Sequence, residues 1–366
     1  MEGAAGHSDP SDLTGLDEGF ERAVLRQAGA RGFLGVSLPT AVGGGGRPPA
    51  FRAAFELEAA FHDAPLIDTA VTLLGGPLLR FGSQAQHDGL LRQAVAGEIT
   101  ACIAYTEADA GSDLGAVSTD ATARWGGGFE LRGTKVLVTG AHKADWCLTI
   151  ARTRPAVPAR EGLSMLLVDM RSPGVSVRRH PTMNGWTLCD VTFDGTVVPD
   201  EGLLGTLHGG WGQLMTAMAD ETASLFHVGF AERLFRTLVD GLRAEGRQDD
   251  PVARDRLGDL RARLDAARRL GIRAATARSG QGAVPAAMAK IYATELHQAM
   301  TAAAADLVGA AAGRWAPLFG GGGQPGGRLG YELLERVHGT IGGGTNETKR
   351  TLLALQGLGL ARPGGG

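Results

Sequence analysis

The spacing of apolar residues along this 366-residue chain changes twice, and these changes limit its possible folds more than any other feature. From residue 16 to 98, apolar residues such as Phe20, Val24 and Ala28 recur at helical intervals. From about residue 99 short β-type runs follow, and after Gly209 the pattern returns to long amphipathic helices. The sequence therefore predicts an α+β multidomain protein with a helical domain (1–98), a middle β domain (99–205) and a C-terminal helical domain (206–366).

The middle region carries turn signals between its β-type runs. The glycines at 126–128 and the pair Asp194-Gly195 are typical of hairpins. A small β-barrel or sandwich is the architecture that such runs favour. The runs cover residues 129–131, 136–138, 146–151, 163–168 and 191–198.

The C-terminal region has the length and pattern of a four-helix bundle. Helices are expected near residues 210–245, 251–278 and 284–313, and a last one from Asn346. The glycine-rich residues 320–327 predict a flexible connection. They match neither a GxxxxGK[S/T] loop nor a strand–GxGxxG–helix context, so they do not indicate a phosphate-binding loop.

Charge and composition argue against several classes of function. The formal net charge is −3 and the basic residues form no stripe, so nucleic acid is not an expected partner. No apolar run is long enough to cross a bilayer and the first residues do not resemble a leader, so we expect a cytoplasmic protein. No HExxH or paired-cysteine spacing indicates a metal site. Cys102, Cys147 and Cys189 each lie in an apolar context and are expected to be buried free thiols.

Two segments of the middle region carry the chemistry. Residues 104–113 and 133–140 are β-type stretches that end in glycine and small hydroxyl residues. Such ends would set backbone N–H groups and hydroxyls against a flat polar ligand. Together with residues 341–347 (Ile-Gly-Gly-Gly-Thr-Asn-Glu), they resemble the flavin-binding signatures of the acyl-CoA dehydrogenase family. The resemblance extends from residue 32 to 360 and implies an FAD-dependent oxidoreductase with that family's helical, β, helical architecture.

The resemblance also implies cofactor contacts. The segment around Tyr105 would line the isoalloxazine ring, the Thr139 hydroxyl would lie near flavin N5, and the C-terminal segment would reach the distal part of FAD. A structural alternative is that these glycines and threonines make turns and that Thr345 caps the last helix. The implied FAD contacts are Tyr105, Thr106, Gly111, Ser112, Leu137, Thr139, Thr345 and Glu347.

The reaction of this family needs a carboxylate base, because a proton leaves the acyl thioester while a hydride passes to flavin N5. Many members carry that glutamate directly before the Gly-Thr of the C-terminal loop, where this chain has Gly343. The resemblance implies that the backbone N–H at this site still polarises the thioester carbonyl. A second branch of the family places the base on the first helix of the C-terminal domain, and Glu221 occupies that place.

Periodicity supports Glu221 independently. Leu214, Met218, Glu221, Leu225 and Val228 are spaced 4, 3, 4 and 3, which predicts one apolar stripe on a single helix. A carboxylate within such a stripe is either functional or paired with an arginine or with helix-end amides. The polar side of the same helix is expected to hold Asp220 with Gln213, Ala217 and Ser224. The implied substrate contacts are Ser112, Met218, Thr222 and Gly343.

Three departures separate this chain from the fatty-acyl enzymes of the family. Thr222 replaces an arginine beside the base, and Leu137 replaces the tryptophan that covers the flavin. The R-x-x-F-G motif, which reaches the cofactor of a neighbouring subunit, is degenerate at residues 246–251. These departures favour a different substrate. The chain resembles the members of polyketide extender-unit (hydroxymalonyl- or methoxymalonyl-ACP) biosynthesis, which implies a small acyl thioester on an acyl carrier protein in antibiotic biosynthesis.

Three other functions stay open at this point. The chain could be an α,β-desaturating dehydrogenase of CoA thioesters, a flavin monooxygenase of the same fold that needs no α-proton base, or a non-catalytic partner subunit of a heteromeric dehydrogenase. The resemblance implies a homodimer or homotetramer. The sequence does not identify the electron acceptor.

Overall fold

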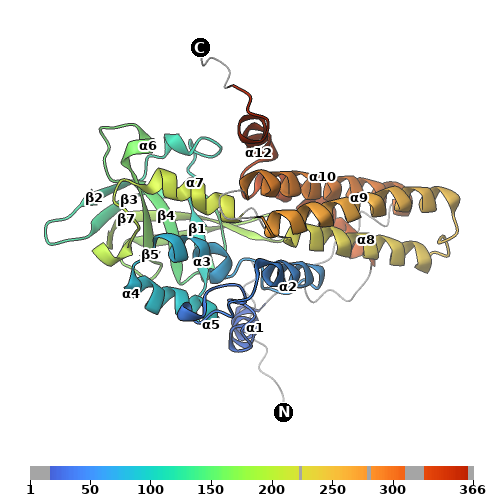
Figure 1. Ribbon diagram of the computed structural model, residues 1–366, viewed down its shortest axis with the longest axis horizontal. Helices are drawn as coiled ribbons and strands as arrows, with labels where there is room; N and C mark the ends of the chain where they lie inside the picture. The colour runs from blue at the N-terminus through green and yellow to red at the C-terminus, as the bar shows by residue number, and fades with distance from the viewer. Residues whose placement is uncertain (1–16, 222–224, 278–281, 310–324, 362–366) are drawn as a thin grey trace.

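In the computed structural model, residues 17–221, 225–277, 282–309 and 325–361 are described, without the side chains of residues 219–221 and 325–327. A β-sheet lies at one end of the molecule and a bundle of long helices at the other, and the N-terminal helices lie along one side of both (Figure 1). The predicted fold class, with its helical, β and helical parts, is confirmed.

The N-terminal helices share a hydrophobic core with the sheet. Thr69 caps α3, where its Oγ1 accepts from Thr72 N at 3.1 Å, and Leu74 and Leu78 of α3 are fully buried. They belong to one cluster with residues of β4 and β5, so apolar burial fixes α3 against the sheet. The helices are α1 (Glu18–Ala30), α2 (Pro49–Phe61), α3 (Ala70–Phe81), α4 (Gln84–Gln86) and α5 (Arg92–Ala96).

The middle domain is one mixed sheet with the strand order β6-β7-β3-β2-β4-β5-β8, and β1 pairs in parallel with β4. Val168 of β5 and Val191 of β7 belong to one core cluster although their strands lie apart in this order, so the sheet curves around its core. The strands are β1 (Ala101–Ala104), β2 (Asp120–Ala123), β3 (Phe129–Thr139), β4 (Trp146–Arg152), β5 (Leu163–Asp169), β6 (Val175–Pro181), β7 (Thr187–Val198) and β8 (Leu203–Leu204), with the short helix α6 (Ala159–Gly162) before β5.

The two predicted hairpin signals have different outcomes. Residues 126–128 join β2 to β3, which are antiparallel, as predicted. Asp194-Gly195 lies inside β7 instead, where Gly195 has a φ of 70° and a register shift falls between Leu131 and Arg132 of β3. This pair forms a β-bulge rather than a hairpin. A glycine with positive φ suits either structure, so the sequence signal was ambiguous.

The C-terminal helices are α7 (Gly210–Glu221), α8 (Phe226–Ala244), α9 (Pro251–Ala275), α10 (Ala283–Val308), α11 (Pro325–Ile341) and α12 (Asn346–Leu352). Helices α8 to α11 pack together as the predicted bundle. The single helix expected over 210–245 is wrong, because α7 ends at Glu221 and packs on α3 and β5. Helix α11 was not predicted. Most of the connection predicted over 320–327 lies outside the described residues.

A charge network joins the N-terminal and C-terminal helices. Arg233 of α8 and Arg328 of α11 each pair with Asp63, which follows α2, and with Glu332 of α11. His297 of α10 lies 2.8 Å from Glu332. Burial would raise the pKa of Glu332, but Arg328, His297 and Arg233 outweigh it and hold the pKa well below its usual range. The fully buried carboxylate is therefore matched by two arginines and a histidine from three helices.

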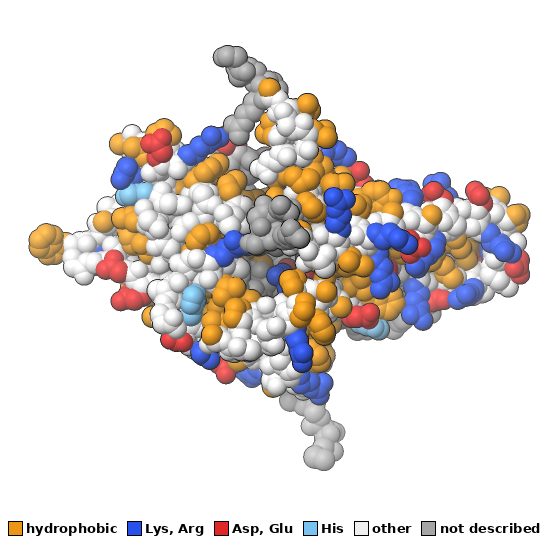
Figure 2. All heavy atoms as spheres, in the orientation of Figure 1, with side chains coloured by type: hydrophobic (Ala, Val, Ile, Leu, Met, Phe, Trp, Pro, Cys, Tyr) orange, Lys and Arg blue, Asp and Glu red, His pale blue; other side chains and the backbone are white. Residues whose placement is uncertain are grey.

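The molecular surface mixes charges of both signs. Figure 2 shows Lys and Arg side chains gathered over the far end of the bundle and interspersed with acidic ones. Arg261 and Asp265 of α9 form one such pair. The three cysteines are buried and free, as predicted. Among the described helices, none combines the length and the apolar character that a membrane span requires.

Candidate functional site

The two segments predicted to hold the flavin lie side by side. The first follows β1 and the second forms the end of β3. Val136 N donates to Thr106 O at 2.9 Å, and Lys135 Nζ donates to Tyr105 O at 3.3 Å. Tyr105 and Thr106 are half-buried at this contact. One backbone and one side-chain hydrogen bond thus fix the first segment to the second.

A buried ion pair fixes the turn that follows Thr106. Glu107 and Ala110 exchange backbone hydrogen bonds of 2.9 and 3.1 Å across this turn. The Glu107 carboxylate accepts from Lys135 Nζ at 2.8 Å and from the N–H and hydroxyl groups of Ser118 and Thr119. Burial would raise the pKa of Glu107, but Lys135 and the two hydroxyls outweigh it and lower the pKa to about 2. The charge of the fully buried Lys135 is therefore matched, and the loop is tied to β3.

The loop beyond this turn is open to solvent. Gly111 and Ser112 are exposed, and a Cβ on Gly111 would meet no atom within 4 Å. On the neighbouring β3, Leu137 has a φ of 57° in a bulge between Lys135 and Val138, and it is 62% exposed. A left-handed backbone costs a non-glycine residue roughly 1–2 kcal/mol, and exposure of leucine to water is also unfavourable. An apolar ring laid over this bulge would cover the leucine.

The C-terminal loop between α11 and α12 lies against α7 and α10. Gly343 and Gly344 have φ angles of 64° and 85°. Lys290 Nζ of α10 donates to Gly344 O at 3.0 Å and to Asn346 Oδ1 at 2.9 Å. A Cβ on Gly344 would lie 3.8 Å from Met218 Cε of α7, whereas one on Gly343 would meet nothing within 4 Å. The loop is therefore held from α10 and faces α7, with open space at Gly343.

The two residues predicted to reach the distal part of FAD begin α12. Thr345 Oγ1 accepts from Thr348 N at 3.1 Å, so the structural alternative, a helix cap, is confirmed for Thr345. Glu347 is exposed, and its carboxylate lies 3.9 Å from Arg350. Their contacts with FAD remain predictions.

Glu221 is the last residue of α7, and its side chain, like the whole of Thr222, lies outside the described residues. Met218 is half-buried and packs on the cluster that also includes Tyr105. Because residues three apart share a helix face, the backbone of α7 brings position 221 to the same side as Met218, which faces the C-terminal loop. The role of Glu221 remains a prediction.

The stripe predicted around Glu221 is only partly correct. Leu214 is buried as expected, but Gln213 and Ala217 of the expected polar side are buried too. Leu225 and Val228 belong to the next helical segment rather than to α7. The reason is that α7 is enclosed by α3, α6 and β5, so more than one of its faces is covered.

A cluster of titratable side chains near the C-terminal loop was not predicted. His338 Nδ1 lies 3.1 Å from Glu335 Oε1, and Glu335 raises the pKa of His338 against the effect of burial. Surrounding atoms raise the pKa of Asp68, although His338 and Lys143 lower it. Asp68 is nevertheless exposed to water. Glu335 and His338 are three apart on α11, but only the fold brings Asp68 to them.

These residues fit FAD. Leu137 presents an uncovered apolar surface, Gly111 and Gly343 leave open space, and Ser112 and Thr139 provide hydroxyls. Donors of this kind beside an apolar face suit an isoalloxazine ring, which has polar edges and a flat apolar face. The residues that would hold the ring are Tyr105, Thr106, Gly111, Ser112, Leu137 and Thr139.

Comparison with known proteins agrees with this site. Family models match three consecutive parts of the chain: "Acyl-CoA dehydrogenase, N-terminal domain" over residues 10–98, the middle domain over 102–196 and the C-terminal domain over 208–358. Acyl-CoA dehydrogenase FadE29 of Mycobacterium tuberculosis is 31% identical over 356 residues, which are 93% of this chain and 89% of that protein. Acyl-CoA dehydrogenase IpdE1 of Mycolicibacterium smegmatis is also 31% identical, over 94% of this chain and 90% of its own length.

Solved structures show the same fold. The Tcur3481–Tcur3483 steroid ACAD is 27% identical with a TM-score of 0.86, covering 97% of this chain and 94% of that one. The ChsE4–ChsE5 complex from Mycobacterium tuberculosis is 25% identical with a TM-score of 0.86 and the same coverage. Fold and site together define a flavin-dependent oxidoreductase. The chain belongs to the acyl-CoA dehydrogenase family and is an FAD-dependent acyl-thioester dehydrogenase.

Proposed function

We propose that this chain oxidises a small acyl thioester and that Glu221 is the base. The observation that carries the proposal is the approach of α7 to the C-terminal loop, where Met218 faces Gly344 and position 343 holds no carboxylate. FAD, when bound, supplies the hydride acceptor. Backbone N–H groups at Gly343 and Gly344 can donate to the thioester carbonyl. Glu221 takes the proton from the carbon beside that carbonyl.

Anaerobic mixing of the FAD-loaded protein with short acyl thioesters tests this proposal. Glu221→Gln should slow flavin reduction by about 10²- to 10⁴-fold, the usual contribution of a general base, with FAD still bound. Asp68→Asn is the matched control, because Asp68 is a second carboxyl near His338, whose ring lies beside Gly342 of the C-terminal loop. Unchanged reduction in Glu221→Gln, or loss in Asp68→Asn alone, contradicts the assignment. A requirement for supplied reduced flavin and oxygen would instead support a monooxygenase.

We further propose that the thioester is carried by an acyl carrier protein, in secondary-metabolite (extender-unit) biosynthesis. Leu137 and Gly343, which depart from the fatty-acyl enzymes, support a substrate outside common fatty-acid oxidation. The names of the similar proteins FadE29 and IpdE1 favour the alternative, a CoA thioester. The same acyl group offered on both carriers separates the two. A higher kcat/KM with the CoA form would reject the carrier-protein proposal.

A second, different chain of the same family is the partner that we propose, rather than a second copy. The degenerate segment at 246–251 supports this choice, because Arg247 donates to Leu307 O and to Asp250 within its own bundle. The name of one similar structure supports it too, since that structure is the ChsE4–ChsE5 complex of two differently named chains. The test is the FAD content and mass of the chain purified alone. Full FAD occupancy and turnover in a homo-oligomer would reject this partner.

A further inference from the structure

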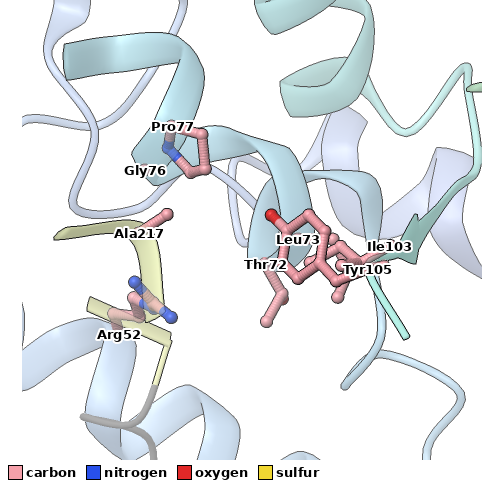
Figure 3. Close-up of a pocket in the computed structure, with 8 residues that line it drawn as sticks. All are labelled: Arg52, Thr72, Leu73, Gly76, Pro77, Ile103, Tyr105 and Ala217. Carbon is pink, nitrogen blue, oxygen red and sulfur yellow. The ribbon is translucent and has the colours of Figure 1, made fainter. Parts of the chain in front are cut away.

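A small cavity lies between α2, α3, β1 and α7, and its lining is mixed (Figure 3). Its volume is about 20 Å³, enough for one water-sized group. Most of the wall is apolar and comes from Leu73, Gly76, Pro77, Ile103 and Ala217. Three side chains with polar atoms complete it: Arg52, Thr72 and Tyr105.

The place of this cavity connects it to the proposed reaction. Tyr105 opens the segment predicted to line the flavin, and Ala217 is one turn before Glu221 on α7. On the proposed function, on which this inference rests, an acyl chain that passes between the flavin and Glu221 has its far end here. The lining of the cavity therefore selects the chemistry of that end.

Arg52 is the only charged residue of the described lining. Its Nε donates to Glu56 Oε1 at 2.6 Å, and Glu56 is buried, at 6% exposure. Figure 3 shows the guanidinium across the cavity from Thr72 and Tyr105. No other partner of Arg52 is found in the described part of the chain. Its Nη groups are thus available as donors to a bound molecule.

The ion pair decides which group fits best. The pair of Arg52 and Glu56 has no net charge, so a carboxylate added at the half-buried guanidinium would bring an unmatched negative charge close to the buried Glu56 carboxylate. An alkyl end would cover the guanidinium without replacing its hydrogen bonds to water. A neutral oxygen accepts from the guanidinium and adds no charge. We propose that the acyl groups taken by this enzyme end in a neutral hydrogen-bond acceptor, a carbonyl or hydroxyl oxygen, that accepts from Arg52.

Three acyl groups of nearly equal shape, each offered on CoA and on an acyl carrier protein, test the proposal: 4-oxopentanoyl, 4-methylpentanoyl and succinyl. They differ at C4, which is a ketone carbon bearing one methyl, a CH carbon bearing two methyls, or the carbon of a carboxylate. Calorimetric titration of the FAD-loaded protein should show the 4-oxo thioester binding about tenfold or more tightly than the 4-methyl one, with succinyl weakest. The same three end groups on acyl chains one methylene shorter and one methylene longer test which chain length brings the end group to Arg52. Equal affinities in every series, or tightest binding of the carboxylate, would overturn the proposal.

Two variants link this preference to the ion pair. Arg52→Met should bring the ratio of 4-oxo to 4-methyl affinity close to one, and Arg47→Met, a neighbouring arginine outside the cavity, should keep the wild-type ratio. Glu56→Gln leaves the cation without its counter-charge, so succinyl should gain at least tenfold relative to the 4-oxo thioester. FAD content and circular dichroism confirm that each variant is folded. An unchanged ratio in folded Arg52→Met refutes the role of Arg52.

When the titration is run in the Glu221→Gln background, in which flavin reduction is slowed, binding is measured without turnover and the two proposals fail separately. Absence of flavin reduction by thioesters that bind would contradict the proposed function and leave the binding order standing. Reduction by all three thioesters with equal affinities would contradict only the role of Arg52.

Discussion

Replacing Lys135 by methionine removes one charge of the buried pair that joins the two segments predicted to hold the flavin, at nearly unchanged side-chain length. Lys135 is 0% exposed and Glu107 6%. The pKa of Glu107 falls from 4.5 to about 2. This shift, which already includes the opposing effect of burial, corresponds to roughly 3 kcal/mol in favour of the ionised carboxylate. Loss of one partner of a buried ion pair costs about 3–5 kcal/mol. Four donors from Ser118 and Thr119 remain on the carboxylate in Lys135→Met. We therefore expect this variant to be destabilised by about 3 kcal/mol, the lower end of that range.

The opposite replacement should cost more. Glu107→Gln leaves the ammonium of Lys135 buried without a counter-charge, and its amide N–H groups would face the donors of Ser118 and Thr119. We expect about 5 kcal/mol, the upper end for a broken buried pair. In the double variant neither charge remains, so its cost should be clearly less than the sum of the two.

Hydrogen exchange read by mass spectrometry measures this effect where it occurs. A chain of several domains need not unfold in one step, so a global melting curve is a poor measure, whereas exchange reports local opening. Peptides over residues 103–110 and 131–140 should lose protection in Lys135→Met, because Val136 N and the Thr106 carbonyl are bonded there. FAD affinity should fall about tenfold or more, as a loss of 1.4 kcal/mol would produce.

Arg132→Met is the matched control on the same strand. Arg132 pairs with Glu130 and Asp194, but its side chain is 59% exposed, and such surface pairs contribute about 0–1 kcal/mol. Equal protection in Lys135→Met and Arg132→Met would refute the reasoning, since it would mean that the buried pair does not close the loop. So would strictly additive costs in the double variant.

Three further predictions follow from single contacts. Because the pKa of Glu107 is depressed in the folded state, its ionised carboxylate stabilises the fold above about pH 4.5, and this contribution is lost as the pH falls toward 2. The difference in hydrogen-exchange protection between wild type and Lys135→Met should therefore shrink as the pH is lowered over that range. Glu332→Gln leaves Arg233, Arg328 and His297 without their shared carboxylate. It should destabilise the bundle by about 3–5 kcal/mol, read by hydrogen exchange in peptides of α8 and α11, whereas exposed Glu347→Gln should change that exchange by less than about 0.5 kcal/mol. Gly344→Ala should lower FAD and thioester affinity more than Gly343→Ala, because both have positive φ but only the Cβ at 344 would come within 3.3 Å of Lys349 Cε.

The sequence indicated the fold where the period of apolar residues was unambiguous, and it failed where a local signal had two meanings. The spacing of Leu214, Met218, Leu225 and Val228 is continuous, yet the chain leaves helix α7 between the second and third of these. Periodicity records which residues are apolar, and it does not record a change in chain direction. Helix α11 was hidden by the glycines around its start, although Pro325 stands at its first position, where the fixed φ of proline suits a helix.

Some residues of the candidate site could be predicted from the sequence and others could not. The paired segments around Tyr105 and Leu137 could be found from their motifs, because small residues at strand ends keep their meaning without a fold. Asp68 and His338 could not be found, since they are separated by 270 positions and only packing brings them together. The ion pair of Lys135 and Glu107 was missed for a related reason. A charged residue in a strand usually faces water, and its burial follows from a partner on another segment.

The surroundings of the C-terminal loop support the proposal that the base lies on α7. Lys290 donates to Gly344 O, and the Lys349 side chain lies close to the same glycine. Both lysines are buried, so a carboxylate placed on this loop would have cations beside it and would be held in its ionised form with a low pKa. A base must take a proton readily near neutral pH, and such a carboxylate would be a poor one. A glycine at position 343 keeps the backbone N–H donors of the loop. The two nearby lysines add a positive electrostatic potential, which favours negative charge on the carbonyl oxygen of the thioester. The same cations that would weaken a base on the loop therefore favour the negative charge that forms on the carbonyl oxygen, provided that the proton is taken from the other side, where α7 lies.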